Sequence, residues 1–362
     1  MRIRNINISV CILAVLSSCG KQIPLENSRS DIGMDVTIAT HEMTKGIVSG
    51  TSFPQNTTIG LFICSHEEGT PSLFEEYSPK YNNIQATQSS STIESPVWSY
   101  KYNGTGTAFP TLFLLKPQTG EPAADFYAYA PFVSGATNPT DIPFSLSAEY
   151  RSLQDILYAS ENDTDVNKGK VPDGSLISIK FHFVHKLAWL QCQFYLKNDD
   201  EDGSHGPESE KDSQNKTTVN SIVLRKKTGG STPLYSSGAF NFIDGTFKSG
   251  SLVDAESLEV KYNYSFGTKG NTFNMLVYPE EYLADGDYEL VFNFDGNTME
   301  TVYSIKVSDL LHSDGVTTGF KEGYRYVLSF TYDNYNHIHL DRTQVDTDAD
   351  WTEFPEQKEI VI

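Results

Sequence analysis

The chain of 362 residues has only four cysteines. Two of them, Cys11 and Cys19, lie near the N-terminus, which leaves Cys64 and Cys192 for the rest of the chain. A structural zinc site needs three or four clustered ligands, so two cysteines without a C-x-x-C spacing do not provide one. In an exported protein, Cys64 and Cys192 could form one disulfide, and in strands they could equally be buried free thiols. The sequence leaves both alternatives open.

Long hydrophobic runs are also lacking. The uncharged apolar stretch at residues 6–16 is shorter than the about 20 residues that a membrane-spanning helix needs. It follows Arg2 and Arg4, and a basic start before a short apolar run is typical of a secretory signal. The stretch ends in LSSC (16–19), which resembles a bacterial lipobox, where cleavage precedes an acylated cysteine. We therefore predict that residues 1–18 are a lipoprotein signal peptide and that Cys19 is lipidated; an ordinary signal peptide with a chance cysteine is the alternative.

Positive charge is scarce. The chain has 27 Lys and Arg against 47 Asp and Glu, which gives a net charge of −20. No stretch of the sequence gathers Lys or Arg into a block. Because nucleic acids and anionic lipid surfaces attract a cationic face, neither is an expected partner.

Helical patterning is missing, since no stretch of about 12 residues keeps an apolar period of 3.6. The chain instead has 20 Tyr and 21 Phe and short alternating runs, beginning at 34–40, with turn signals such as Asp295–Gly296 between them. At 57–65 the alternation places Ile59, Leu61 and Ile63 on one face and Phe62 and Cys64 on the other. These patterns predict an all-β protein of β-sandwiches with few and short helices.

The apolar residues of the run at 176–196 change face midway, which one regular strand cannot do. We therefore expect Phe181, Phe183 and Leu187 in one core and Leu190 and Phe194 in another. The expected parts of the chain are a signal peptide (1–18), a flexible tether (19–33), an N-terminal β-sandwich (34–171), a C-terminal β-sandwich (172–345) and an acidic linker with a strand-like end (346–362).

Known catalytic motifs are absent, including G-x-S-x-G, H-E-x-x-H and the phosphate-binding glycine loops. His337 and His339 would share one face of a strand, but the sequence fixes no third ligand for a metal. Residues 346–351 alternate acidic side chains, yet an EF-hand would need Gly and Glu where Trp351 and Gln357 stand. We predict no catalytic residue, no cofactor and no metal site, and we expect that the protein is not an enzyme.

A series of short motifs runs along the chain: the lipobox ending at Cys19, TKG (44–46), Phe53, TIGLF (58–62), FYAYAPF (126–132), DILYAS (155–160), FHFVHKLAWL (181–190), EGYRYVLSF (322–330) and Trp351. In this order they resemble the fimbrillin-like lipoproteins of Bacteroidales, the subunits of type V pili. The resemblance implies two tandem transthyretin-like β-sandwich domains displayed at the outer membrane. Because Gly20 rather than Asp follows Cys19, nothing indicates retention at the inner membrane.

The resemblance also implies a route of assembly. A trypsin-like protease cuts after an Arg or Lys beyond the first strand, the lipid and that strand leave, and a neighbouring subunit's strand fills the groove. Lys45, followed by Gly46, is the candidate maturation site because it follows the predicted strand at 34–40. It could also be an ordinary exposed lysine. Arg29 is the alternative cleavage site, but a cut there would precede that strand and leave the groove filled.

The strand-like end of the chain, Ile360, Val361 and Ile362, follows an acidic linker. It could act as a donor strand, or it could fold back on the edge of its own sheet. Together these features predict a shaft or accessory subunit of a type V pilus, exported as an outer-membrane lipoprotein, assembled with other subunits by strand exchange and supporting adhesion to a host or bacterial surface ligand. The alternative is a monomeric surface-exposed lipoprotein that binds glycans or host molecules.

Overall fold

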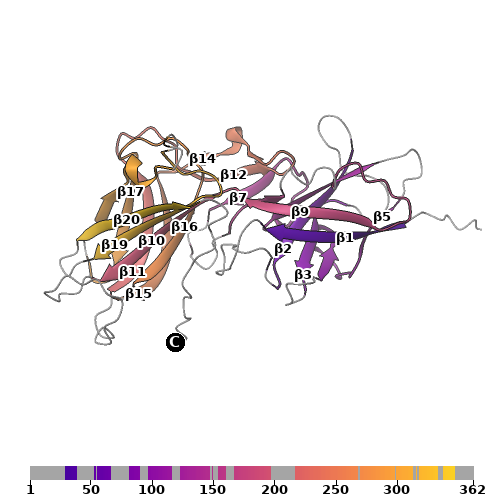
Figure 1. Cartoon of the computed structure of the whole chain (residues 1–362), viewed down its shortest axis with the longest axis horizontal. Helices are drawn as coiled ribbons and strands as arrows, with labels where there is room; N and C mark the ends of the chain where they lie inside the picture. Colours follow the sequence, from indigo (N-terminus) through magenta and orange to yellow (C-terminus); the bar gives the residue numbers. More distant parts are fainter. Residues whose placement is uncertain are drawn as a thin grey trace, which may run out of the picture.

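The computed structural model is almost entirely β-structure (Figure 1). It describes residues 29–38, 53, 55–66, 81–89, 97–115, 123–146, 149, 154–159, 167–196, 217–267, 270–297, 299–312, 315, 318–332 and 337–346. The described elements are twenty strands and three short 3-10 turns, Tyr102–Gly104, Ser249–Ser251 and Val307–Asp309. The all-β class predicted from the alternating pattern is confirmed. Within these ranges, no helix is long and apolar enough to cross a membrane.

One large sheet forms the right-hand part of the molecule in Figure 1. It has eight strands in the order β4-β3-β2-β6-β8-β9-β1-β5. Their bounds are β1 Arg29–Ile38, β2 Thr58–Ser65, β3 Ile84–Gln88, β4 Trp98–Lys101, β5 Leu112–Leu115, β6 Ala124–Ala130, β8 Leu157–Ala159 and β9 Ile177–His185. The first strand in sequence therefore lies inside this sheet, next to a strand that comes about 145 residues later.

Three smaller sheets form the rest of the fold. Two of them have the orders β16-β10-β19-β20 and β15-β11-β17-β18, and the third joins β13-β12-β14 to β7. Their bounds are β7 Ile142–Ser145, β10 Ala188–Leu196, β11 Thr217–Lys226, β12 Tyr235–Asn241, β13 Thr246–Phe247, β14 Val253–Asp254, β15 Ser257–Phe266, β16 Asn271–Val277, β17 Tyr288–Phe294, β18 Thr301–Ser304, β19 Arg325–Tyr332 and β20 Ile338–Asp346.

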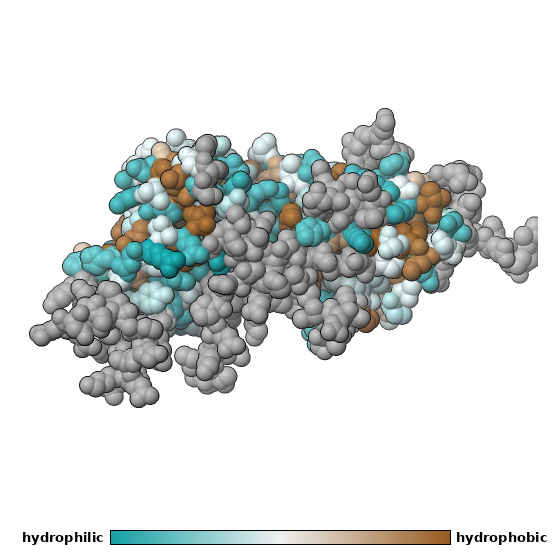
Figure 2. Space-filling view, in the orientation of Figure 1, coloured by the Kyte–Doolittle hydropathy of each residue, from teal (hydrophilic) through white to brown (hydrophobic). Residues whose placement is uncertain are grey.

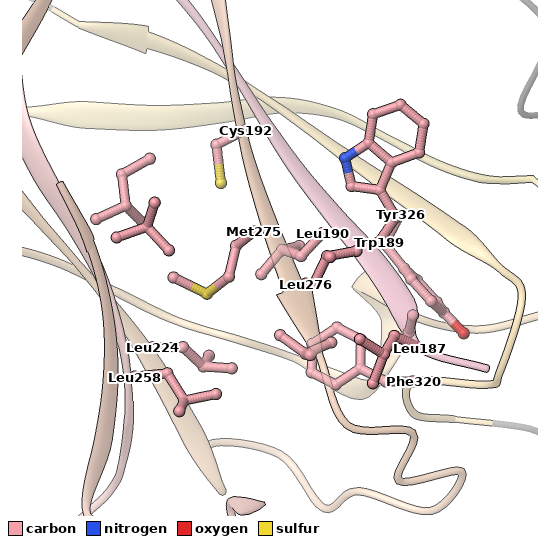
Figure 3. Close-up of a cluster of buried hydrophobic side chains, with 14 of the residues drawn as sticks. Leu187, Trp189, Leu190, Cys192, Leu224, Leu258, Met275, Leu276, Phe320 and Tyr326 are labelled. Atoms are coloured by element: carbon pink, nitrogen blue, oxygen red, sulfur yellow. The ribbon is translucent and has the colours of Figure 1, made fainter. Parts of the chain in front are cut away.

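Two hydrophobic cores lie against these sheets. The N-terminal core includes Ile59, Leu61, Ile63, Leu112, Leu114, Phe126, Ile179, Phe181 and Phe183. The large core includes Phe62, Cys64, Tyr129, Trp189, Leu190, Cys192, Phe194, Met275 and Tyr326, part of which Figure 3 shows. Strand β2 thus buries both faces, one in each core, and its residues divide between the two faces as the alternation predicted. Because both cores use the same strand, its register is fixed from two sides.

The two parts of the molecule are joined through packed aromatic side chains. The ring centroid of Tyr129 on β6 lies 5.9 Å from that of Phe62 and 4.6 Å from that of Phe242. The ring centroids of Tyr158 and Phe240 are 6.2 Å apart. Strand β7 leaves the large sheet region and pairs with β12, between the two parts in Figure 1. The junction is therefore an apolar contact strengthened by main-chain pairing.

The change of core within residues 176–196 is confirmed, with one correction. Phe181 and Phe183 lie in the N-terminal core, and Leu190 and Phe194 lie in the large core. Leu187, expected beside Phe181, instead belongs to the large core. The segment is two strands, β9 and β10, interrupted at Lys186 and Leu187, so Leu187 no longer follows the alternation of β9. The division into domains stays a prediction, and this break would place its boundary near 186–187 rather than 172.

The first strand begins earlier than expected. Strand β1 starts at Arg29, not at residue 34, so residues 29–33 of the expected tether belong to a sheet. Ser30 and Ile32 are buried there, while Asp31 between them is exposed. The polar sequence of residues 29–33 did not indicate a strand, because the burial of this segment depends on pairing with β5 and β9, which are far away in the chain.

The two cysteines of the folded region are buried free thiols. Burial raises the pKa of the Cys64 thiol from 9.0 to about 12, with a smaller contribution from the negative charge of Asp125. Burial also raises the pKa of Cys192. Of the two alternatives that the sequence left open, the structure has the free thiols.

Candidate functional site: the first strand and its groove

Strand β1 lies between β9 and β5 in the order of the large sheet, and Figure 1 shows it beside β9. We call the place that β1 occupies between these two strands the groove. It runs parallel to β9 in a register from Ile32 opposite Ile177 to Ile38 opposite Phe183. Its first residues run antiparallel to β5, from Arg29 opposite Leu115 to Ile32 opposite Leu112. Only Ile32 pairs on both sides, and in the described sheet β9 and β5 do not pair with each other, so β1 bridges them.

Strand β5 depends on β1 for its place in the sheet. In the described part of the chain, β5 pairs with no strand but β1. Its attachments also include the amide of Leu115, which donates to the hydroxyl oxygen of Tyr81 at 3.0 Å, and the buried side chains of Leu112 and Leu114. Loss of β1 would therefore remove the strand pairing of β5 and leave contacts of this kind.

The floor of the groove is apolar. Leu112 and Leu114 from one wall and Ile179 and Phe181 from the other are at most 1% exposed, and all four belong to the N-terminal core. Ile32 of β1 joins them, with 5% of its surface exposed. An empty groove would combine exposed apolar side chains with unpaired main-chain groups, and these two features make a sheet edge recruit another strand.

A polar contact lies at the start of the groove. The side chain of Ser30 is fully buried, and its oxygen accepts hydrogen bonds from the amides of Asp173 (3.1 Å) and Gly174 (3.0 Å). Both donors belong to the turn that precedes β9. The sequence analysis missed this contact, since nothing in the local sequence connects Ser30 to residues 143 and 144 positions away.

The other end of the groove is marked by Phe53. Its ring packs edge-on against Phe183 at 5.2 Å and against Trp98 at 6.3 Å. Ile38, the last residue of β1, pairs with the same Phe183. Residues 39–52 therefore connect two points that are both beside Phe183. This connection is the covalent link between β1 and the following strands, with which β1 otherwise interacts through main-chain pairing and side-chain contacts.

The sequence-predicted site residues fall at different places relative to this groove. Arg29 is the first residue of β1, and its main chain pairs with Leu115. Arg29 therefore lies inside the first strand, and the prediction that it precedes this strand was wrong. Cys19, Lys45 with Gly46, and Ile360, Val361 and Ile362 lie outside the described residues.

Other polar side chains of the described residues make separate contacts elsewhere in the fold. Over the described ranges, no three His, Cys, Asp or Glu side chains come close enough to hold a metal ion. His337 and His339 are exposed at the start of β20. Buried polar groups instead pair within the fold: His185 with Asp155, and the indole of Trp189 with Asn274 at 3.0 Å.

The comparison with known families is decisive. A fimbrillin-like family model matches residues 47–348. The chain belongs to the fimbrillin-like family. The matched region begins after β1 and includes β2 to β20. No curated protein matches the chain.

Solved structures resemble this fimbrillin-like chain over nearly its whole length. A protein of Bacteroides uniformis assigned to cell adhesion is 14% identical, has a TM-score of 0.51, and is matched over 90% of this chain and 99% of its own. A protein of Bacteroides ovatus assigned to cell adhesion is 15% identical, with a TM-score of 0.52 and coverage of 88% and 96%. A fimbrial protein of Bacteroides vulgatus is 16% identical, with a TM-score of 0.49 and coverage of 88% and 99%. The first two share the fold of this chain.

Proposed function

We propose that this fimbrillin-like protein is a structural subunit, shaft or accessory, of a type V pilus that supports adhesion. In this proposal it is exported as a lipoprotein, anchored to the outer membrane through Cys19, and assembled by strand exchange. The observation that carries the proposal is the position of β1: an N-terminal strand fills an interior place in a sheet, and its covalent link to the following strands runs through residues 39–52.

Proteolysis within that connection would turn β1 into a replaceable strand. A cut after Lys45 lies outside every described strand, and it would separate β1 and the lipid from β2 onward. Phe53 follows the cut, so its packing on Phe183 would keep the new N-terminus beside the groove.

A cut β1 would not leave at once. It matches seven residues of β9 and four of β5, and each main-chain hydrogen bond stabilises by a net ~1 kcal/mol. The strand would therefore stay until a competing strand displaces it. A neighbouring subunit supplies that competitor, and the apolar floor of the groove favours its burial.

The shape of the molecule fits a filament. The groove of β1 lies in the right-hand part of Figure 1, and β20, the last described strand, forms the edge of a sheet in the left-hand part. A strand given at one end and accepted at the other makes a head-to-tail contact, which extends without closing. Residues 347–362 follow β20, and in this proposal their end, Ile360, Val361 and Ile362, is the candidate donor strand.

The test is a pair of cleavage-site variants in cells. Lys45→Ala should prevent separation of β1 and abolish the ladder of polymers on an unboiled gel. Arg29→Ala is the matched control, and it should leave the ladder unchanged. If Lys45→Ala leaves a normal ladder, strand exchange through this cut is excluded. A wild-type protein that is monomeric and lipidated would favour the surface lipoprotein that binds glycans or host molecules.

A further inference from the structure

The turn before β9 presents two amides to the groove of β1. Asp173 and Gly174 donate from successive main-chain positions to one oxygen, that of Ser30. We use the name Ser30 pocket for these two amides together with the space that is occupied by the Ser30 side chain. Ser30 is fully buried, so water does not replace its oxygen as an acceptor.

The geometry of the pocket is set by the turn and not by β1. The carboxylate of Asp173 accepts from the amide of Ser175 at 2.8 Å and from its hydroxyl at 2.5 Å. These bonds lower the pKa of Asp173. Gly174 has a φ of +92°, which few other residues adopt. Successive amides in such a turn form a concavity that binds an oxygen acceptor. The two donors would therefore keep their direction after β1 leaves.

The neighbouring positions of β1 do not need a buried polar atom. Ile32 needs an aliphatic residue because it packs in the N-terminal core. A side-chain carbon added at Gly33 would meet Leu176 at 3.6 Å, which is an ordinary contact. Asp31 is exposed. Among positions 30–33, only Ser30 must supply a polar atom to the interior.

We propose that the Ser30 pocket selects the strand that fills the groove. The chosen strand carries a serine or threonine opposite Asp173 and Gly174 and an aliphatic residue two positions away, at the place of Ile32. This inference rests on the proposed strand exchange. It adds the chemistry by which the groove recognises its partner.

The requirement excludes a particular donor. In the tail at residues 352–362, TEFPEQKEIVI, the one serine or threonine is Thr352, and the residues two positions from it are Asp350 and Phe354, neither of which is aliphatic. A second copy of the chain therefore cannot satisfy the Ser30 pocket with its own strand-like end, in either direction. In this inference, the strand that fills the groove is a segment other than residues 352–362 of a second copy.

The first test uses the uncut full chain and two variants of equal shape. Ser30→Thr keeps an oxygen at the pocket, whereas Ser30→Val replaces it with a methyl group. Amide exchange of residues 171–176, followed by mass spectrometry, should be at least about tenfold faster in Ser30→Val than in Ser30→Thr. Asp31→Asn, at the exposed position beside it, should exchange like the wild type. Equal exchange rates in the Thr and Val variants would refute the claim that an oxygen at position 30 holds the amides of Asp173 and Gly174.

The second test measures selection. The full chain is nicked after Lys45 and mixed with labelled peptides of residues 29–40, either wild-type or carrying Ser30→Thr or Ser30→Val. The wild-type and Thr peptides should be taken up at least about tenfold more strongly than the Val peptide. Equal uptake of all three would refute selection by the pocket and leave strand exchange standing. No uptake of any peptide would contradict strand exchange itself, and the inference with it.

Discussion

Single residues at the junction show how tightly the two parts are fitted together. Gly60 on β2 pairs with Tyr129 on β6, and a side-chain carbon at Gly60 would lie 2.0 Å from the Tyr129 ring. That ring cannot move freely, because its hydroxyl donates to Asn83 at 2.7 Å and its face packs on Phe242. A glycine is therefore required here by close approach of a ring.

We predict that Gly60→Ala destabilises the protein by about 1–3 kcal/mol, as overpacking of a filled core does. Gly250→Ala is the control, since nothing lies within 4 Å of the added carbon there. It should change stability by less than ~0.5 kcal/mol. Urea unfolding of the two purified variants measures the difference. Equal stabilities would mean that the Tyr129 ring is not fixed as described.

Buried ionisable groups predict a loss of stability at high pH. The pKa of the Cys64 thiol rises from 9.0 to about 12, and burial raises that of Tyr81 from 10.0 to about 12. The unfolded chain releases these protons at lower pH than the folded chain does. The stabilising contribution of Cys64 is therefore complete below pH 9.0 and lost as the pH rises to about 12. The free energy of unfolding should fall across this range, and fall less steeply in Cys64→Ala; parallel pH profiles of the two proteins would contradict the assignment.

At the scale of elements, β9 and β10 divide one continuous run of sequence between two cores. Phe181 lies in the N-terminal core, and Phe194 in the large core contacts rings of four other strands, including Phe292 at 4.9 Å and Phe330 at 5.3 Å. Truncating either buried ring to Ala should destabilise by about 3–5 kcal/mol.

The two truncations should loosen different elements. Phe181→Ala should speed amide exchange mainly in β1, β8 and β9, and Phe194→Ala mainly in β10, β11, β17 and β19. Exchange mapped by mass spectrometry distinguishes the two patterns. If both variants accelerate exchange equally throughout the chain, the two cores behave as one cooperative unit.

The sequence predicted those features of the elements that depend on local alternation. The two faces of β2 and the change of core near residue 187 follow from a side-chain period of two. The start of β1 and the isolation of β5 were not predictable in this way. Both depend on which distant strands pair, and the polar residues Ser30 and Asp31 give no local sign of a strand. The Ser30 pocket was missed for the same reason, since its donors are in a turn before β9.

At the scale of the whole molecule, the account depends on a strand that belongs to the sheet yet can be replaced. Apart from β5, the described strands of the large sheet would keep a pairing partner after β1 leaves. The side of β9 away from β1 stays paired, first by β8 and then by Asn167, whose side-chain oxygen accepts from the amide of Lys180 at 2.8 Å. The junction of the two parts uses β6, β7 and β12, none of which pairs with β1.

The N-terminal sequence of the protein in polymers recovered from cells tests the central claim most directly. The account predicts that polymerised chains begin at Gly46, without β1 and without lipid, while precursor chains begin at a lipidated Cys19. Polymerised chains that begin at Cys19 or at Ser30 would retain β1 in its groove and would contradict assembly by strand exchange at this site.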